Sequence, residues 1–285
     1  MRWQMSRRSE NVEDRRGISM GKGIGGLGLG GIVILLLLGW LLQGDPLALL
    51  NTGSSGFSPE TTIEQTAQTP EDDKMADFVS AVLGDIEDVW TEIYARSGSV
   101  YQKPKLVIFL GATQSACGYA QSATGPFYCP TDEKVYLDMS FFDELSRGFG
   151  ASGDFAQAYV IAHEIGHHIQ NLQGTLDKVQ QMRGRISEEE YNQLSVRLEL
   201  QADFYAGVWA HHAEKSRDIL ESGDLEEALN AASSIGDDRI QKQTQGYVVP
   251  DSFTHGTSEQ RVRWFRKGFE TGDVRQGDTF STNIL

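Results

Sequence analysis

The chain of 285 residues is poor in cysteine, in internal repetition and, beyond its first residues, in basic side chains. The lack of repeats argues for one main domain of ordinary composition. Residues 1–22 hold six of the 25 Lys and Arg but three of the 40 Asp and Glu, so the remainder has 19 bases and 37 acids. This acidity disfavours nucleic acid as a partner and mainly favours solubility.

One run has no charge at all, from Gly23 to Leu42. About twenty apolar residues suffice to cross a bilayer as a helix, so we expect a transmembrane helix over residues 23–43. Basic residues precede the run and Asp45 follows it. The positive-inside rule then predicts a single-pass protein of the cell (inner) membrane, with residues 1–22 as a cytoplasmic basic N-terminus and the rest periplasmic or otherwise extracytoplasmic.

Two export signals are alternatives to a membrane anchor that is retained in the mature protein. A cleaved signal peptide would need a small-x-small site after a shorter apolar region, and this sequence lacks one. The pairs Arg7-Arg8 and Arg15-Arg16 suggest twin-arginine export only weakly, because no convincing apolar pair follows either. Residues 44–69 are rich in Gly, Ser, Thr, Gln and Pro, which predicts a flexible linker before a domain over residues 70–285.

The domain begins with strong helix signals. Thr69 precedes Pro70 and three acidic residues, the pattern of a capped helix start, and apolar residues then recur every three or four positions to Ile93. Further helices are expected over residues 154–172, 188–214, 224–235 and 257–271, and one that Ser140 and Asp143 would open as a capping pair. Residues 105–110 and 134–138 read as strands. The predicted fold class is α+β, mostly helical with a small β-sheet.

Cys117 and Cys129 are twelve positions apart in a segment that contains Gly and Pro. Outside the cytoplasm such a pair more often forms a disulfide than a metal site, so we predict a bridge between them, with two reduced structural thiols as the alternative.

The chemistry is concentrated in the stretch His163-Glu164-Ile165-Gly166-His167. On a helix, His163 and His167 project from one face and can share a metal, while Glu164 is offset towards the water that the metal holds. His168 is rotated by about 100° and is not expected to bind this metal. Gly166 either admits another backbone or is tolerated at a small cost in helix propensity.

A second pair lies one helix later, where Glu199 and Asp203 are one turn apart. Glu199 is our candidate third metal ligand, and Asp203 is expected to fix the tautomer of a ligating imidazole, His163. Two His and one carboxylate leave a position open for water, as a catalytic Zn²⁺ site requires, whereas a solvated helix face is the alternative. Glu164 would then assist the attack of zinc-bound water on a peptide bond.

His255 follows the core helices in a polar loop and is a candidate second donor to the oxyanion, with a plain loop histidine as the alternative. His211 and His212 are expected to be surface or packing residues.

These motifs give the sequence a resemblance, over nearly its whole length, to the neutral zinc metallopeptidase family of YpfJ-like bacterial membrane proteins. It rests on Asn11 to Gly17, Gly125 to Pro130, Val135 to Asp138, the HEIGHHIQ stretch, Glu199 to Asp203, Gly236 to Arg239, and Asp251 to Gly256. The HExxH and ExxxD segments also resemble the gluzincins. This implies a zincin-like domain, substrate binding along an edge strand at Val135 to Asp138, and a His255 that reaches the oxyanion.

The leading hypothesis is a membrane-anchored zinc peptidase acting on protein or peptide substrates. A cell-wall peptide amidase is a second enzymatic possibility. The alternative from another class is a catalytically idle adaptor that keeps zinc for folding and binds a membrane or envelope partner. The retention of Glu164 argues against the adaptor, since a structural site has no use for that base. Asp237, Asp238 and Arg239 read as a structural salt-bridged turn, with a place in the cleft as the alternative.

Overall fold

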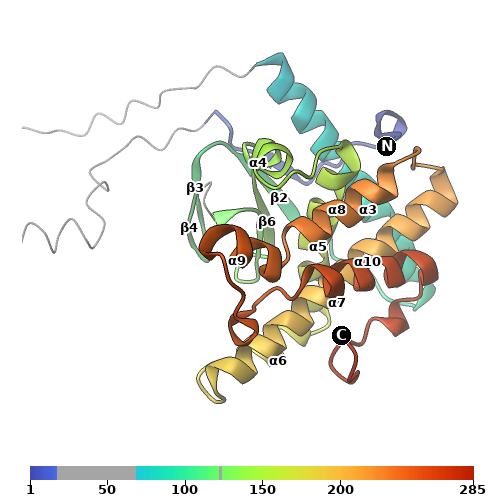
Figure 1. The fold of residues 1–285 in the computed structure, drawn as a ribbon. Coiled ribbons are helices and arrows are strands. Elements are labelled where there is room, and N and C mark those ends of the chain that lie inside the picture. The colour runs from blue at the N-terminus through green and yellow to red at the C-terminus, as the bar shows by residue number, and fades with distance from the viewer. Residues whose placement is uncertain (18–68, 122–123) are drawn as a thin grey trace, which may run out of the picture. The chain divides into compact units, whose positions relative to one another are not determined.

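The computed structural model describes residues 1–17, 69–121 and 124–285. Residues 1–15 and 68–285 make up one compact unit. The unit is α+β, mostly helical with a small sheet (Figure 1). The helices are α3 (Pro70–Arg96), α4 (Phe141–Arg147), α5 (Asp154–Leu172), α6 (Thr175–Gln180), α7 (Glu188–Arg217), α8 (Asp224–Ser234), α9 (Asp237–Gln245) and α10 (Ser258–Thr271). Short 3₁₀ turns span Trp3–Met5, Pro250–Ser252 and Val274–Gln276.

Three of the long helices begin at capping boxes. Thr69, Ser187 and Thr257 each accept a hydrogen bond from the backbone three residues on, and the side chain at that position binds back. Such pairs satisfy two backbone donors that a helix start leaves free. The capping pair predicted at Ser140 is wrong: α4 forms, but the Ser140 hydroxyl binds Asp138 at 2.8 Å and makes no side-chain cap.

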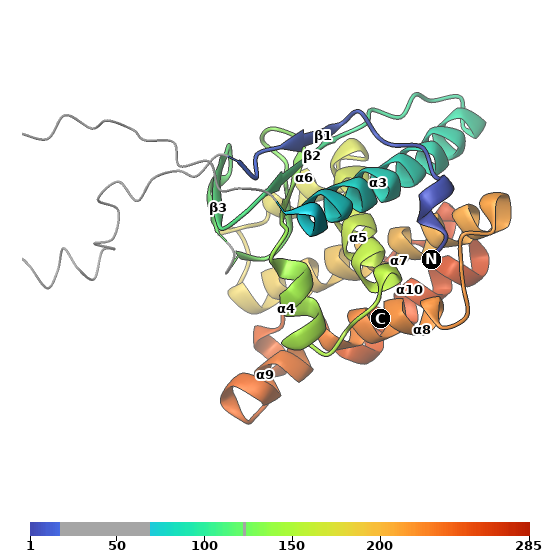
Figure 2. The ribbon, with the colours of Figure 1, turned by 90° about the horizontal axis from the view of Figure 1, so that it is seen from above.

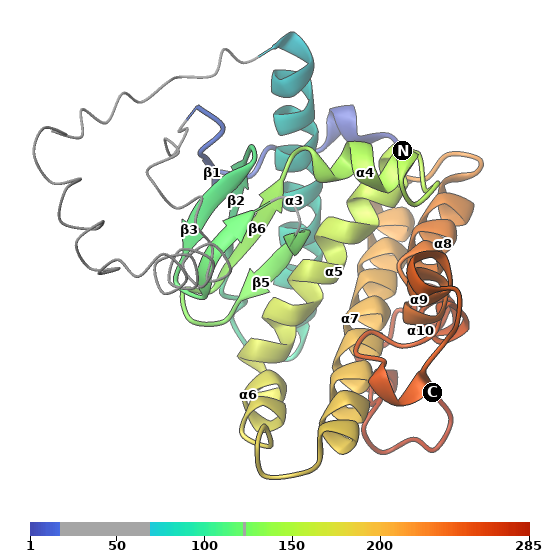
Figure 3. The same ribbon diagram turned by 60° about the vertical axis from the view of Figure 1, so that its left-hand side comes forward.

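The main sheet has the strand order β1 (Val12–Asp14), β2 (Lys105–Phe109), β6 (Lys134–Asp138), β5 (Phe127–Cys129). The first two pairings are parallel and the last is antiparallel. A separate hairpin joins β3 (Ala112–Ser115) and β4 (Gly118–Gln121). The expected edge strand at Val135 to Asp138 is wrong for Val135 and Tyr136, which pair with β2 on one side and with β5 on the other. The edge strand on that side of the sheet is β5, which lies beside α5 (Figure 3).

The first fifteen residues belong to this unit, which the sequence did not lead us to expect. In β1, Val12 lies opposite Leu106 of β2 (Figure 2), and the Trp3 ring packs edge-on against Phe78 of α3 at 5.4 Å. The basic residues that suggested a cytoplasmic segment are used in ion pairs within the unit: Arg7 with Glu87 and Asp88, Arg8 with Asp77, and Arg15 with Glu13. The domain is thus larger than residues 70–285.

This pairing constrains any membrane topology. Among the described residues no helix has both the length and the apolar character needed to span a bilayer. The expected transmembrane helix at 23–43 and the linker at 44–69 lie outside the described residues, apart from Thr69, which caps α3. Within the described unit β1 pairs with β2, so these two strands lie on the same side of any bilayer.

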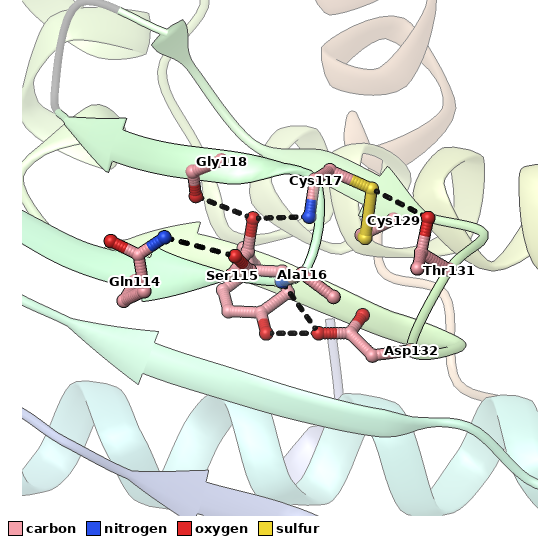
Figure 4. The surroundings of a disulfide bond; sticks show 9 residues. Gln114, Ser115, Ala116, Cys117, Gly118, Cys129, Thr131 and Asp132 are labelled. Carbon is pink, nitrogen blue, oxygen red and sulfur yellow. Dashed lines mark hydrogen bonds between the residues drawn. A yellow bond between two sulfur atoms is a disulfide. The ribbon is translucent and has the colours of Figure 1, made fainter.

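Cys117 and Cys129 are joined in a disulfide, with their Cα atoms 5.8 Å apart (Figure 4). The bridge links the turn between β3 and β4 to the last residue of the edge strand β5. Around it, the backbone of Cys117 donates to the Ser115 hydroxyl, and the backbone of Ala116 donates to Asp132. The hairpin and the edge strand are thereby fixed to one another.

Candidate metal centre

Helix α5 carries the HExxH residues with the bounds predicted for it, residues 154–172. His163 and His167 lie one turn apart with ring centroids separated by 4.9 Å. Between them, Gly166 lets α7 approach closely, because a Cβ there would lie 2.9 Å from the Cα of Ala202. Gly166 therefore admits another backbone, which is the first of the two uses considered from the sequence. The close approach brings Glu199 of α7 next to the two imidazoles.

His163, His167 and Glu199 present ligand atoms that all lie within 4.8 Å of one another. The Nε2 atom of His163 is 3.2 Å from one carboxylate oxygen of Glu199, and Nε2 of His167 is 3.5 Å from the other. Burial by itself raises the pKa of Glu199, but the charge of His167 and the hydrogen bond to His163 outweigh it and lower the pKa. Glu199 is thus an ionised carboxylate, the form that binds a metal.

Both imidazoles are held from behind through Nδ1. His163 Nδ1 lies 2.7 Å from Asp203, and His167 Nδ1 lies 2.9 Å from the side-chain oxygen of Gln170. Gln170 is itself fixed, since its amide donates to the carbonyl of Leu198 at 2.7 Å. With Nδ1 as the donor in each ring, a metal can bind at Nε2, on the side where Glu199 lies, once it displaces the proton that His163 Nε2 shares with Glu199. Two neutral imidazoles and one carboxylate fit Zn²⁺ with a position left for water or substrate.

Asp203 is the buried centre of the network behind His163. It also accepts from Tyr159 at 2.5 Å and from Arg261 at 2.8 and 2.9 Å. Burial raises the pKa of Asp203, but the positive charges of Arg261 and His163 outweigh this and lower it to about 2. Asp203 is therefore ionised and holds the Nδ1–H of His163, as its spacing from Glu199 suggested.

A second acidic group within the described residues, Asp154, Asp224 and Glu227, also has ligand-like spacing. The amino group of Met1 lies 2.6 Å from Asp154 and 3.3 Å from Asp224. The cluster thus already has an ammonium group as its cationic partner and offers no argument for a second metal.

The three candidate ligands line a cleft of about 530 Å³. Glu164 and His255 line the same cleft, so the structure brings together every residue to which the sequence gave a part in the chemistry. Its walls are largely apolar and include Phe127, Tyr128, Phe141, Phe149, Leu176 and Ile240. Glu164 is 8% exposed, so a largely buried carboxylate lines the same cleft as the three candidate ligands.

His255 is held by the start of α9. One oxygen of Asp237 lies 3.2 Å from His255 Nδ1, and the other accepts from the backbone of Thr254, His255 and Gly256 at 2.6 to 3.0 Å. Burial lowers the pKa of His255, but the hydrogen bond to Asp237 and the charge of Glu199 outweigh it and raise the pKa. Asp237 and Asp238 therefore shape the histidine loop through its backbone, where we expected a salt-bridged turn.

The remaining histidines lie elsewhere. His168 is buried between the Tyr128 hydroxyl and the carbonyl of Gln102, at 3.0 and 2.7 Å. His211 and His212 bind the carbonyls of Phe269 and Gly272 near the end of α10. All three have structural partners, in keeping with the sequence analysis.

Two histidines and one carboxylate at ligand-like spacing, on helices that pack beside a small sheet, define the class as an α+β protein with a candidate metal centre. The chain belongs to the family described as "Putative neutral zinc metallopeptidase", whose model matches residues 1–280. The cofactor of this family is Zn²⁺.

Among its relatives, YpfJ of Escherichia coli (strain K12) is 49% identical over 293 aligned residues that cover all of both chains. Mb2605 of Mycobacterium bovis is 42% identical over 218 residues, 73% of this chain and 71% of that one. Both relatives are named as uncharacterized proteins. No solved structure matches the chain.

Sequence reasoning missed four residues that support the site: Tyr159, Gln170, Asp237 and Arg261. Gln170 had a local signal, because it follows His167 by three positions and so lies one helical turn away. Tyr159 precedes His163 by four positions and had the same kind of signal. Asp237 had a signal as part of a family motif, but it was read as structural. Arg261 had none, since it reaches the site from a helix whose position depends on tertiary packing.

Proposed function

We propose that this protein is a zinc-dependent peptidase that hydrolyses peptide bonds in proteins or peptides. The observation that carries the proposal is the placement of Glu164. A structural zinc site needs no free carboxylate, yet Glu164 lines the same largely apolar cleft as the three ligands. A base in that position is what hydrolysis requires.

In the mechanism, His163, His167 and Glu199 hold the zinc ion. When bound, the ion acts as a Lewis acid and lowers the pKa of a water molecule towards neutrality. Glu164 accepts a proton from the attacking water and then delivers it to the leaving amine. His255 has its Nδ1 engaged by Asp237, which leaves Nε2 to donate to the oxyanion that develops on the scissile carbonyl.

The substrate would lie along β5. This strand is at the edge of the sheet, and its residues Phe127 and Tyr128 line the cleft. An edge strand offers main-chain groups that pair with an extended peptide, while the pockets beside it select side chains. The apolar walls favour substrates with large apolar side chains next to the scissile bond.

We also propose that the protein is attached to the membrane through residues 23–43 and acts on the extracytoplasmic side. The disulfide between Cys117 and Cys129 supports that compartment, because such bonds persist where the environment is oxidising. The pairing of β1 with β2 supports a position for residues 1–15 on the same side, in place of the cytoplasmic position expected from their charge.

The test is cleavage of an unstructured protein by the full chain and by Glu164→Gln. Loss of a general base predicts a fall in kcat/KM of about 10²- to 10⁴-fold, with zinc retained. Glu189→Gln, at an exposed position in the first turn of α7, is the matched control and should cleave normally. Wild-type chain that carries zinc but cleaves nothing would instead favour the adaptor.

A further inference from the structure

Arg261 of α10 is a fully buried cation directly behind the metal centre, with its side chain 2% exposed. Its Nε donates to one oxygen of Asp203 at 2.8 Å and its Nη2 to the other at 2.9 Å. The same Nη2 lies 3.3 Å from the Tyr159 hydroxyl and 3.3 Å from His163 Nδ1, and Nη1 donates to the carbonyl of Ile235 at 3.3 Å. The guanidinium therefore spans α5, α7 and the end of α8.

Two glycines let Arg261 reach this position. A Cβ on Gly207 of α7 would lie 2.1 Å from the carbonyl oxygen of Phe265, and one on Gly268 of α10 would lie 2.1 Å from that of Phe204. The two helices thus contact backbone to backbone at a reciprocal pair of glycines, and any side chain there would push them apart. This close packing delivers a guanidinium from α10 to the interior face of α7, where Asp203 lies.

The contacts at Asp203 show what the guanidinium does. One carboxylate oxygen takes three donors, from Tyr159, His163 and Arg261, while the other takes Nε of Arg261. A two-point contact to a planar fork fixes the rotation of a carboxylate, which a single hydrogen bond does not. It also compensates a charge that is wholly buried. The direction in which Asp203 holds the His163 ring is therefore set by Arg261.

We propose that Arg261 is a positioning residue of the zinc centre, which locks Asp203 so that His163 presents Nε2 to the metal. The proposal rests on the zinc centre of the proposed function, but not on peptide cleavage. Outer-shell partners of metal ligands commonly contribute 10- to 100-fold to metal affinity, and Arg261 acts one residue further out through Asp203. Lysine cannot substitute, because its ammonium group is a point charge without the two-point fork.

The experiment measures the zinc dissociation constant of the full chain by competition with a chelator. Arg261→Lys and Arg261→Met are compared with Arg266→Lys and Arg266→Met, which change an exposed arginine on the same helix. Near-ultraviolet circular dichroism of the zinc-free protein reports the fold. We expect both Arg261 variants to weaken zinc binding by about 10- to 100-fold, with the zinc-free fold kept in Arg261→Lys. The Arg266 variants should leave the zinc dissociation constant unchanged.

A double-mutant cycle with Asp203→Asn separates positioning from a general effect of charge. If Arg261 acts through Asp203, Asp203→Asn combined with Arg261→Met should bind zinc no more weakly than the worse single variant. Fully additive losses, an unchanged dissociation constant in Arg261→Lys, or loss of the zinc-free fold in Arg261→Lys would each overturn the proposal. A wild-type chain that binds zinc tightly but does not cleave peptides would contradict the proposed function alone.

Discussion

The hydroxyl of Ser9 donates a 2.6 Å hydrogen bond to Glu87, whose side chain is 1% exposed. Arg7 and Asn11 donate to the same carboxylate, each at 2.7 Å. One buried charge on α3 thus fixes the first residues of the chain to the rest of the domain, and the β1–β2 pairing continues the attachment.

Glu87→Gln should therefore destabilise the whole domain. Hydrogen bonds to a charged group contribute about 1.5 to 3 kcal/mol, and the amide would place two donors against those of Ser9 and Asn11. We expect a loss of about 2 kcal/mol in the free energy of unfolding, measured by urea titration of the full chain. Glu92→Gln, on the same helix but in an exposed pair with Arg96, should cost less than about 0.5 kcal/mol. Equal costs for the two variants would mean that the first residues add nothing to the fold.

The contribution of Glu87 should also depend on pH in a defined direction. Burial raises the pKa of Glu87, but hydrogen bonds from Arg7 and Ser9 outweigh it, so the folded-state pKa lies below the usual 4.5. A carboxyl group of this kind stabilises the fold above its unfolded pKa and loses that effect as pH falls through the folded pKa. The stability difference between wild type and Glu87→Gln should thus be constant near neutrality and shrink below pH 4.5. A difference that stays flat to pH 3 would refute this reading.

Membrane topology gives a third prediction. Met5 and Val100 are 94% and 86% exposed, on opposite sides of residues 18–68 in the sequence. Because both belong to one folded unit, Met5→Cys and Val100→Cys should react alike with a membrane-impermeant maleimide applied to intact cells. The native cysteines are in a disulfide and do not interfere. If one position is labelled in intact cells and the other becomes labelled only after permeabilisation, a bilayer separates the two positions.

Local signals accounted for most of the helices. Helix α5 has the bounds that its periodicity predicted, and the caps at Thr69 and Thr257 are set by residues within four positions of each other. Helix α9 was missed because only Ile240 among its residues is strongly apolar, so no apolar residues recur at helical spacing.

Long-range features were not predictable in this way. The strand β1 is three residues long, with no alternating pattern, and exists because β2 lies beside it. The edge strand was misplaced because strand order is set by the packing of the whole chain, not by the pattern of β6 itself. At the metal centre, the ligands follow from helical spacing, whereas Arg261 arrives through the close contact of α7 and α10.

His255 and Asp237 give a prediction about catalysis. Removal of one oxyanion donor commonly costs about 10²- to 10³-fold, so His255→Ala should lower kcat by about 10²-fold with zinc retained. Asp237→Asn should lower kcat by a smaller factor, because the amide still contacts the His255 ring but holds its orientation less firmly. The matched control is Asp238→Asn, since Asp238 binds the backbone of Ser258 at 2.7 Å and not the histidine. If Asp237→Asn and Asp238→Asn lower kcat equally, Asp237 has a purely structural role.

The central claim, that His163, His167 and Glu199 hold one zinc ion, is tested most directly by the zinc content of the purified full chain, determined by mass spectrometry. The account predicts one zinc per chain in the wild type and in Glu164→Gln, and little or none in His167→Ala or Glu199→Ala, with all four proteins folded. A wild-type chain without zinc, or one that keeps it after either ligand is removed, would contradict the account.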